Sequence, residues 1–97
     1  MPTAGPIRPI HGTRFELTLE RVHEGRAQYL ASVMRSEATW TLSLELSLES
    51  TSIVRDDAAL PDDARTQLLA LSKTTAKRSA DEPWPRRVLR WRQPGVR

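Results

Sequence analysis

The clearest pattern in this chain is a strict alternation of apolar and polar residues over positions 38 to 50, ATWTLSLELSLES. Successive side chains of a β-strand point to opposite faces, whereas helical spacing would scatter these leucines around the axis. The alternation therefore predicts a strand with one buried face and one face in water. The predicted buried positions are Trp40, Leu42, Leu44, Leu46 and Leu48.

The same alternation occurs earlier, in TRFELTLERV from Thr13 to Val22. His23-Glu24-Gly25 follows, and a glycine there supplies the positive φ that a hairpin turn usually needs. Arg26 to Arg35 is then the returning strand, which leads through a second turn into the strand described above. These segments predict an antiparallel meander of three strands. Ser52 to Arg55 either extends the third strand past a bend or forms a short fourth strand.

A helix is predicted from about Pro61 to Ser79. Proline suits the first helical position, and Asp62 and Asp63 complement the positive end of the helix dipole. Apolar and small residues recur at helical spacing and form one stripe. The stripe consists of Ala64, Leu68, Leu71 and Thr75. The sequence Asp81-Glu82-Pro83 ends the helix.

These elements predict a two-layer α+β domain. An antiparallel meander of three to four strands is covered on its leucine face by a single helix, and a C-terminal amphipathic element completes the domain. The domain extends over residues 13 to 97. Residues 1 to 12 contain three prolines and no apolar stretch, so they are interpreted as a flexible N-terminal arm.

The C-terminal element, residues 84 to 92, fits two conformations. In a strand, one side carries Arg87, Leu89 and Trp91, and the other side carries Arg86, Val88, Arg90 and Arg92. In a helix, Pro85 takes the first position, and Trp84, Val88 and Trp91 form a stripe. Both conformations give an amphipathic element, and the sequence leaves the choice between them open.

Size and composition bear on assembly and location. A chain of 97 residues forms one domain and buries only about 60–65 % of its unfolded surface. Cysteine is absent, so disulfides cannot add stability, and association with another chain is expected instead. No apolar run is long enough to span a bilayer or to form a signal-peptide core, so a cytoplasmic location is expected.

Charge is unevenly distributed along the chain. Residues 1 to 64 contain six arginines and ten acidic residues, a net charge of −4, whereas residues 65 to 97 contain nine basic and two acidic residues, a net charge of +7. This asymmetry points weakly to a nucleic acid or another acidic partner. Asparagine is absent and 13 of the 15 basic residues are arginine, which indicates a GC-rich, bacterial genome and weakens any inference from arginine content alone.

Catalytic chemistry finds little support in the sequence. A nucleophile needs a base within hydrogen-bond reach, but the only histidines are His11, in the expected arm, and His23, at the expected turn. Neither has a recognisable spacing to carboxylates, and no phosphate-binding glycine loop or GxSxG motif occurs. We therefore expect a protein that is not an enzyme, with no metal site, no cofactor and no small-molecule substrate.

The solvent face of the predicted sheet is acidic. Its carboxylates are Glu16, Glu20, Glu45 and Glu49. Sheets that bind nucleic acids present aromatic and positively charged groups instead, so this face should repel a phosphate backbone. It is either a solvated polar face, which is the favoured interpretation, or a docking face for a basic partner.

Candidate binding residues concentrate in the C-terminal element. They are Trp84, Arg86, Arg87, Arg90, Trp91 and Arg92. Trp and Arg often dominate protein interfaces, so the leading hypothesis is a small binding or regulatory module that acts through protein contacts, as an oligomer or as a subunit of a complex. The alternative is a nucleic-acid-binding protein in which the arginines contact phosphates and a tryptophan stacks on a base. In a third arrangement, the basic segment of one chain covers the acidic sheet face of a second copy.

Overall fold

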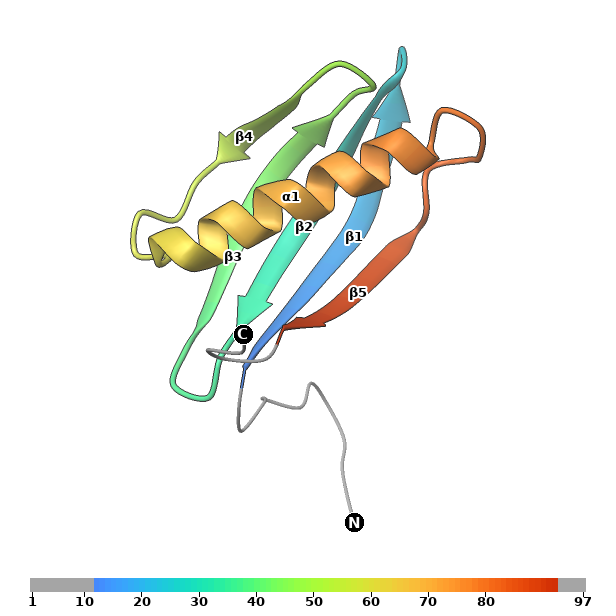
Figure 1. Cartoon of the computed structure of the whole chain (residues 1–97). Helices are drawn as coiled ribbons and strands as arrows, with labels where there is room; N and C mark the ends of the chain where they lie inside the picture. Colours follow the sequence, from blue (N-terminus) through green and yellow to red (C-terminus); the bar gives the residue numbers. More distant parts are fainter. Residues whose placement is uncertain (1–11, 93–97) are drawn as a thin grey trace.

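The structure, a computed structural model, describes residues 12 to 92, without the side chain of Arg92. It contains one five-stranded antiparallel sheet, ordered β4-β3-β2-β1-β5, and one helix (Figure 1). The elements are β1 (Thr13–His23), β2 (Arg26–Met34), β3 (Thr39–Leu46), β4 (Thr51–Arg55), α1 (Asp62–Arg78) and β5 (Arg87–Arg92). The predicted α+β architecture is confirmed, with one strand more than the meander alone. The expected arm, apart from Gly12, lies outside the described residues.

The turn between β1 and β2 has the geometry that its sequence favours. Glu24 and Gly25 both have positive φ, 52° and 77°, and His23 pairs directly with Arg26. A two-residue loop with positive φ at both positions matches the right-handed twist of the two strands. Gly25 adopts this conformation without steric cost, while Glu24 is the only non-glycine residue with positive φ in the described part of the chain.

β1 contains a bulge that the alternating pattern does not reveal. Leu19 pairs with Tyr29 and Arg21 pairs with Gln28, so Glu20 has no partner in β2. An extra residue in one strand reverses the inward and outward positions beyond it. Beyond Glu20, Arg21 consequently shares a sheet face with Gln28.

The core lies between the leucine face of the sheet and α1. It is formed by Phe15, Leu17, Ala27, Tyr29, Ala31, Val33, Leu42, Leu44, Leu46, Leu60, Ala64, Leu68 and Leu71. The predicted helical stripe is buried along its whole length, including Thr75, whose hydroxyl donates to the carbonyl oxygen of Leu71. Pro61 occupies the N-cap, one position before the helix, rather than the first helical position.

Leu48 departs from the prediction for β3. It is 59 % exposed, because β3 ends at Leu46 and the chain turns between Ser47 and Ser50. The hydroxyl oxygen of Ser47 accepts the backbone N–H groups of Glu49 and Ser50, at 3.3 and 3.1 Å. Serine side chains can in this way take backbone N–H groups that would otherwise bond to a neighbouring strand. The strand therefore stops at Leu46, although the alternation of residue types continues beyond it.

α1 crosses the sheet obliquely, so the chain leaves β4 at one edge and returns at the opposite edge as β5 (Figure 1). Ion pairs fix the beginning of the helix: Arg35 contacts Asp63 and Arg65 contacts Asp56, each at 2.7 Å. Hydrogen bonds from these arginines lower the pKa of both aspartates below its usual range. Because α1 leads the chain from the β4 edge to the opposite edge of the sheet, β5 pairs with β1.

Leu44 and Leu48 occupy equivalent positions in the alternating pattern but opposite environments in the structure. We expect Leu44→Ala to lower the free energy of unfolding by about 2–5 kcal/mol, because it leaves a cavity in the core. Leu48→Ala should change it by no more than about 0.5 kcal/mol. Urea denaturation of both variants measures the difference. Equal losses would show that β3 and its buried face continue to Leu48.

Candidate interaction surface

β5 forms a regular ladder with β1. Cross-strand pairs run without interruption from Thr13 with Arg92 to Thr18 with Arg87. The ladder continues one step further, since the N–H of Leu19 donates to the carbonyl oxygen of Arg86 at 2.8 Å. Of the two conformations that the sequence allows for this segment, the strand is the one observed. It satisfies backbone groups of β1 that a helix would leave unpaired.

Trp84 and Pro85 anchor the start of β5 to the core. The Tyr29 hydroxyl donates to the carbonyl oxygen of Pro85 at 2.6 Å. The half-buried ring of Trp84 packs edge-on against Tyr29, with ring centroids 6.3 Å apart. Tyr29 is fully buried, and burial raises its pKa to about 12. The sequence places Tyr29 in the returning strand, but no local signal connects it to a segment so distant along the chain.

The two faces of β5 have different surroundings. Val88 lies opposite Leu17 and packs against the core, so it faces the helix side of the sheet. Leu89 lies opposite Glu16 and Trp91 opposite Arg14, on the face that α1 does not cover, hereafter the open face. Leu89 and Trp91 remain 43 % and 54 % exposed.

Arg87 joins this surface to β1. Its Nε donates to Oε2 of Glu16 at 2.8 Å, and Nη2 of Arg14 lies 4.0 Å from the other oxygen of the same carboxylate. The glutamate side chain is only 19 % exposed, whereas that of Arg87 is 58 % exposed. The contact between the basic segment and the acidic sheet face, which the sequence suggested for two copies, thus forms within one chain.

The four predicted carboxylates occupy different positions in the fold. Glu16 and Glu45 lie on the open face, and Glu45 is 3.8 Å from Nη1 of Arg26. Glu20 sits at the bulge of β1, and Glu49 lies in the turn after β3. Neighbouring arginines therefore offset the two carboxylates that do share the face. The positions of the bulge and the turn depend on strand pairing, so the alternating pattern alone could not distinguish the surroundings of these four glutamates.

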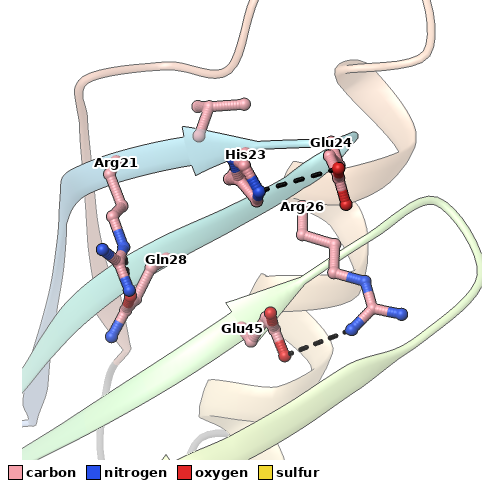
Figure 2. Close-up of a pocket in the computed structure, with 7 residues that line it drawn as sticks. Arg21, His23, Glu24, Arg26, Gln28 and Glu45 are labelled. Atoms are coloured by element: carbon pink, nitrogen blue, oxygen red, sulfur yellow. Dashed lines mark hydrogen bonds and ion pairs between the residues drawn. The ribbon is translucent and has the colours of Figure 1, made fainter.

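A shallow hollow of about 590 Å³ lies at the hairpin end of the open face. Its lining residues are Arg21, Val22, His23, Glu24, Arg26, Gln28 and Glu45. Figure 2 shows that polar side chains of the hollow pair with one another, Arg21 with Gln28 and Arg26 with Glu45. The hydrogen bond from Arg21 to Gln28 measures 3.0 Å, and the ion pair between Arg26 and Glu45 measures 3.8 Å. His23 and Glu24, 3.8 Å apart, have side chains 80 % and 82 % exposed. Such solvated groups lack the enclosure that tunes catalytic groups.

The remaining predicted site residues divide between the two faces. Arg86 and Arg90 lie on the helix side of β5, exposed, and neither side chain has a hydrogen bond or ion pair to another described residue. Trp91 lies on the open face with Arg87. The exposed tryptophan and the partner-free arginines therefore point away from each other. A strand produces this separation because its successive side chains point to opposite faces, whereas a helix would distribute the same side chains around its axis.

Two chemistries receive no support from residues 12 to 92. They contain no cluster of three or more His, Asp or Glu side chains that could hold a metal ion. Their single helix is neither long enough nor apolar enough to cross a membrane. Comparison with protein-family models, with curated proteins and with solved structures finds no match for this chain.

The Tyr29 contact makes a prediction about pH, and Tyr29 is the only tyrosine in the chain. The folded protein should release the phenolic proton at about pH 12, whereas the unfolded chain releases it near 10. Between these values the unfolded state binds fewer protons, so stability is complete below pH 10 and falls as pH rises toward 12. Ultraviolet absorbance of tyrosinate, followed with and without urea, measures the two midpoints.

Tyr29→Phe is the matched control for this titration. It should lose the alkaline fall in stability that belongs to the phenol. It should also lower the free energy of unfolding by about 1 kcal/mol at neutral pH, because the Pro85 carbonyl loses its donor. A folded protein that titrates near pH 10 would contradict the burial of Tyr29 beneath the start of β5.

Proposed function

We propose that this protein is a non-enzymatic binding module that acts through protein contacts. The contact surface comprises Arg87, Leu89 and Trp91, hereafter the Trp91 surface. The observation that carries the proposal is the exposure of Leu89 and Trp91, 43 % and 54 %, side by side on a sheet face that the helix leaves uncovered. Tryptophan and arginine are the residues that most often dominate the energy of protein interfaces.

The geometry supports tight contacts at this surface. Leu89 and Trp91 lie two residues apart on the same face of a strand that is hydrogen-bonded to β1, so little conformational freedom is lost when a partner covers both side chains. Burying the exposed half of a tryptophan contributes on the order of 2 kcal/mol from apolar area. Arg87, held by Glu16 but still 58 % exposed, can donate further hydrogen bonds at the rim.

A nucleic acid fits this surface less well than a protein does. Single-strand binding combines stacking aromatics with a positively charged track along the same surface. Here Trp91 lies on the open face, while the exposed side chains of Arg86 and Arg90 lie on the helix side. Glu16 also stands beside Arg87 on the open face, where it would repel phosphates. These positions favour a protein partner, including a second copy of this chain. We propose a cytoplasmic setting for that contact, with which the absence of cysteine is compatible.

Site-specific photo-cross-linking tests the proposal. The photoreactive residue p-benzoylphenylalanine replaces Leu89 in one variant and Ala70, an exposed residue of α1, in the matched control. We expect protease-sensitive adducts from Leu89 in cells that make the protein, and none above background from Ala70. Adding Trp91→Ala to the Leu89 variant should reduce the adduct at least about tenfold, which corresponds to about 1.4 kcal/mol.

The kind of adduct decides between the partners. An adduct of twice the monomer mass identifies a second copy, and a mixed adduct identifies another protein. Both outcomes support the proposal. Adducts that nuclease removes, or equal labelling from Leu89 and Ala70, would overturn it.

A further inference from the structure

We infer that the free edge of β5 receives an extended strand from a partner protein, and that this strand alternates apolar and acidic residues. The inference rests on the proposed function and specifies the chemistry of the partner. β5 is the last strand of the sheet, and no described element lies beyond it (Figure 1). Such an edge can pair with an added strand through main-chain hydrogen bonds.

The backbone of β5 presents its unpaired groups at regular intervals. Residues of an antiparallel ladder alternate between those bonded to the neighbouring strand and those directed away from it. Because the carbonyl oxygen of Arg86 accepts from Leu19 of β1, the bonded positions continue at Val88 and Arg90. The N–H and C=O groups at Arg87, Leu89 and Trp91 are therefore directed toward the free edge.

The other edge of the sheet is less suited to pairing. β4 is shorter than β5, and Val54 forms a bulge in it, since Arg55 lies opposite Ser43 while Ile53 lies opposite Leu44. A bulge bends a strand and disturbs the spacing of its outward hydrogen-bonding groups. β5, in contrast, has an unbroken register with β1 over its full length. The regular edge is the one that carries the arginines.

Side chains beside the free edge define what the added strand must contain. A residue directly opposite another across two strands lies about 4.5–5.5 Å away and on the same face. On the open face, the added strand meets the exposed side chains of Leu89 and Trp91, which favour apolar residues. On the helix side it meets Arg86 and Arg90, whose side chains lack partners among the described residues and favour carboxylates. The added strand that fits this edge therefore alternates apolar residues with acidic residues.

Charge selects such a partner over a second copy of β5. Pairing β5 with itself would place arginines against arginines, in a part of the chain, residues 65 to 97, with nine basic and two acidic residues. Like charges directly opposite one another destabilise a strand pair, and they suppress self-association along an edge. The same arginines attract an acidic strand, so they disfavour pairing with a second copy of β5 and favour pairing with an acidic partner.

The test uses a fluorescein-labelled peptide of alternating valine and glutamate, titrated with the full chain at about 50 mM salt, with binding followed by anisotropy. We expect saturable binding, weakened at least about tenfold by Arg90→Glu and unchanged by Arg78→Glu, the same charge reversal at the end of α1. A peptide of alternating valine and lysine should not bind.

Two further measurements test the backbone pairing. Leu89→Pro removes an edge-directed N–H without taking a hydrogen bond from β1, so it should abolish peptide binding, while Leu89→Thr keeps the N–H and should bind more weakly than wild type. Circular dichroism and urea denaturation check that each variant is folded. Should Leu89→Pro unfold, a peptide with N-methyl groups at alternate residues replaces it. Methylation in the register that faces β5 should abolish binding, and methylation in the other register should not.

The outcomes separate this inference from the proposed function. Absence of peptide binding, or equal effects of Arg90→Glu and Arg78→Glu, would overturn the edge inference. Protein adducts from the photoreactive residue at Leu89 would still support a protein-binding module in that case. Binding that tolerates both registers of N-methylation would also overturn strand addition, because it would show attraction without backbone pairing. Displacement of the peptide by single-stranded DNA, with the same sensitivity to Arg90→Glu, would assign the edge to nucleic acid instead.

Discussion

Burial of one leucine-rich sheet face beneath a single helix is the constraint on which the rest of this structure depends. Residues 12 to 92 contain one helix to cover the four antiparallel strands of the meander, and α1 does so by crossing them obliquely from the β4 edge. The end of the helix is thereby delivered to the far side of the sheet, beside β1. The Tyr29 hydroxyl then holds Pro85, and Trp84 packs against the same ring, so the chain re-enters the sheet as β5.

The same constraint explains why the functional candidates are exposed. The helix covers one face, so the side chains of β5 that point to the other face have only strand neighbours for cover among residues 12 to 92. Leu89 and Trp91 are on that face, with Glu16 and Arg87 paired beside them. On the helix side, only Val88 reaches the core, and Arg86 and Arg90 remain in solvent. Strand geometry thus yields an edge with apolar groups on one face and, on the other, two arginine side chains that have no partner in the described part of the chain.

This arrangement changes the meaning of the arginine-rich C-terminal segment. Within a basic tail, arginine and tryptophan act together and suit a nucleic acid. Within the edge strand β5, Arg86 and Arg90 lie on the face opposite Trp91, and we propose that the edge-directed backbone groups are a third recognition element. A partner that uses all three must itself be an extended chain, because only a strand can meet the two faces and the edge together.

Local pattern by itself determined the elements of this protein: the alternation predicted β1 and β3, the stripe from Ala64 to Thr75 predicted the buried side of α1, and Gly25 predicted the hairpin. These features depend on neighbours along the chain, which a sequence displays directly. The exposure of Leu48, the bulge at Glu20 and the choice of strand for β5 depend on pairing between distant segments. Only the tertiary structure decided them, because hydrogen-bond register and coverage by the helix arise when the sheet assembles. The candidate site belongs to this second class: its residues were visible in the sequence, but their division between two faces and a free edge was not.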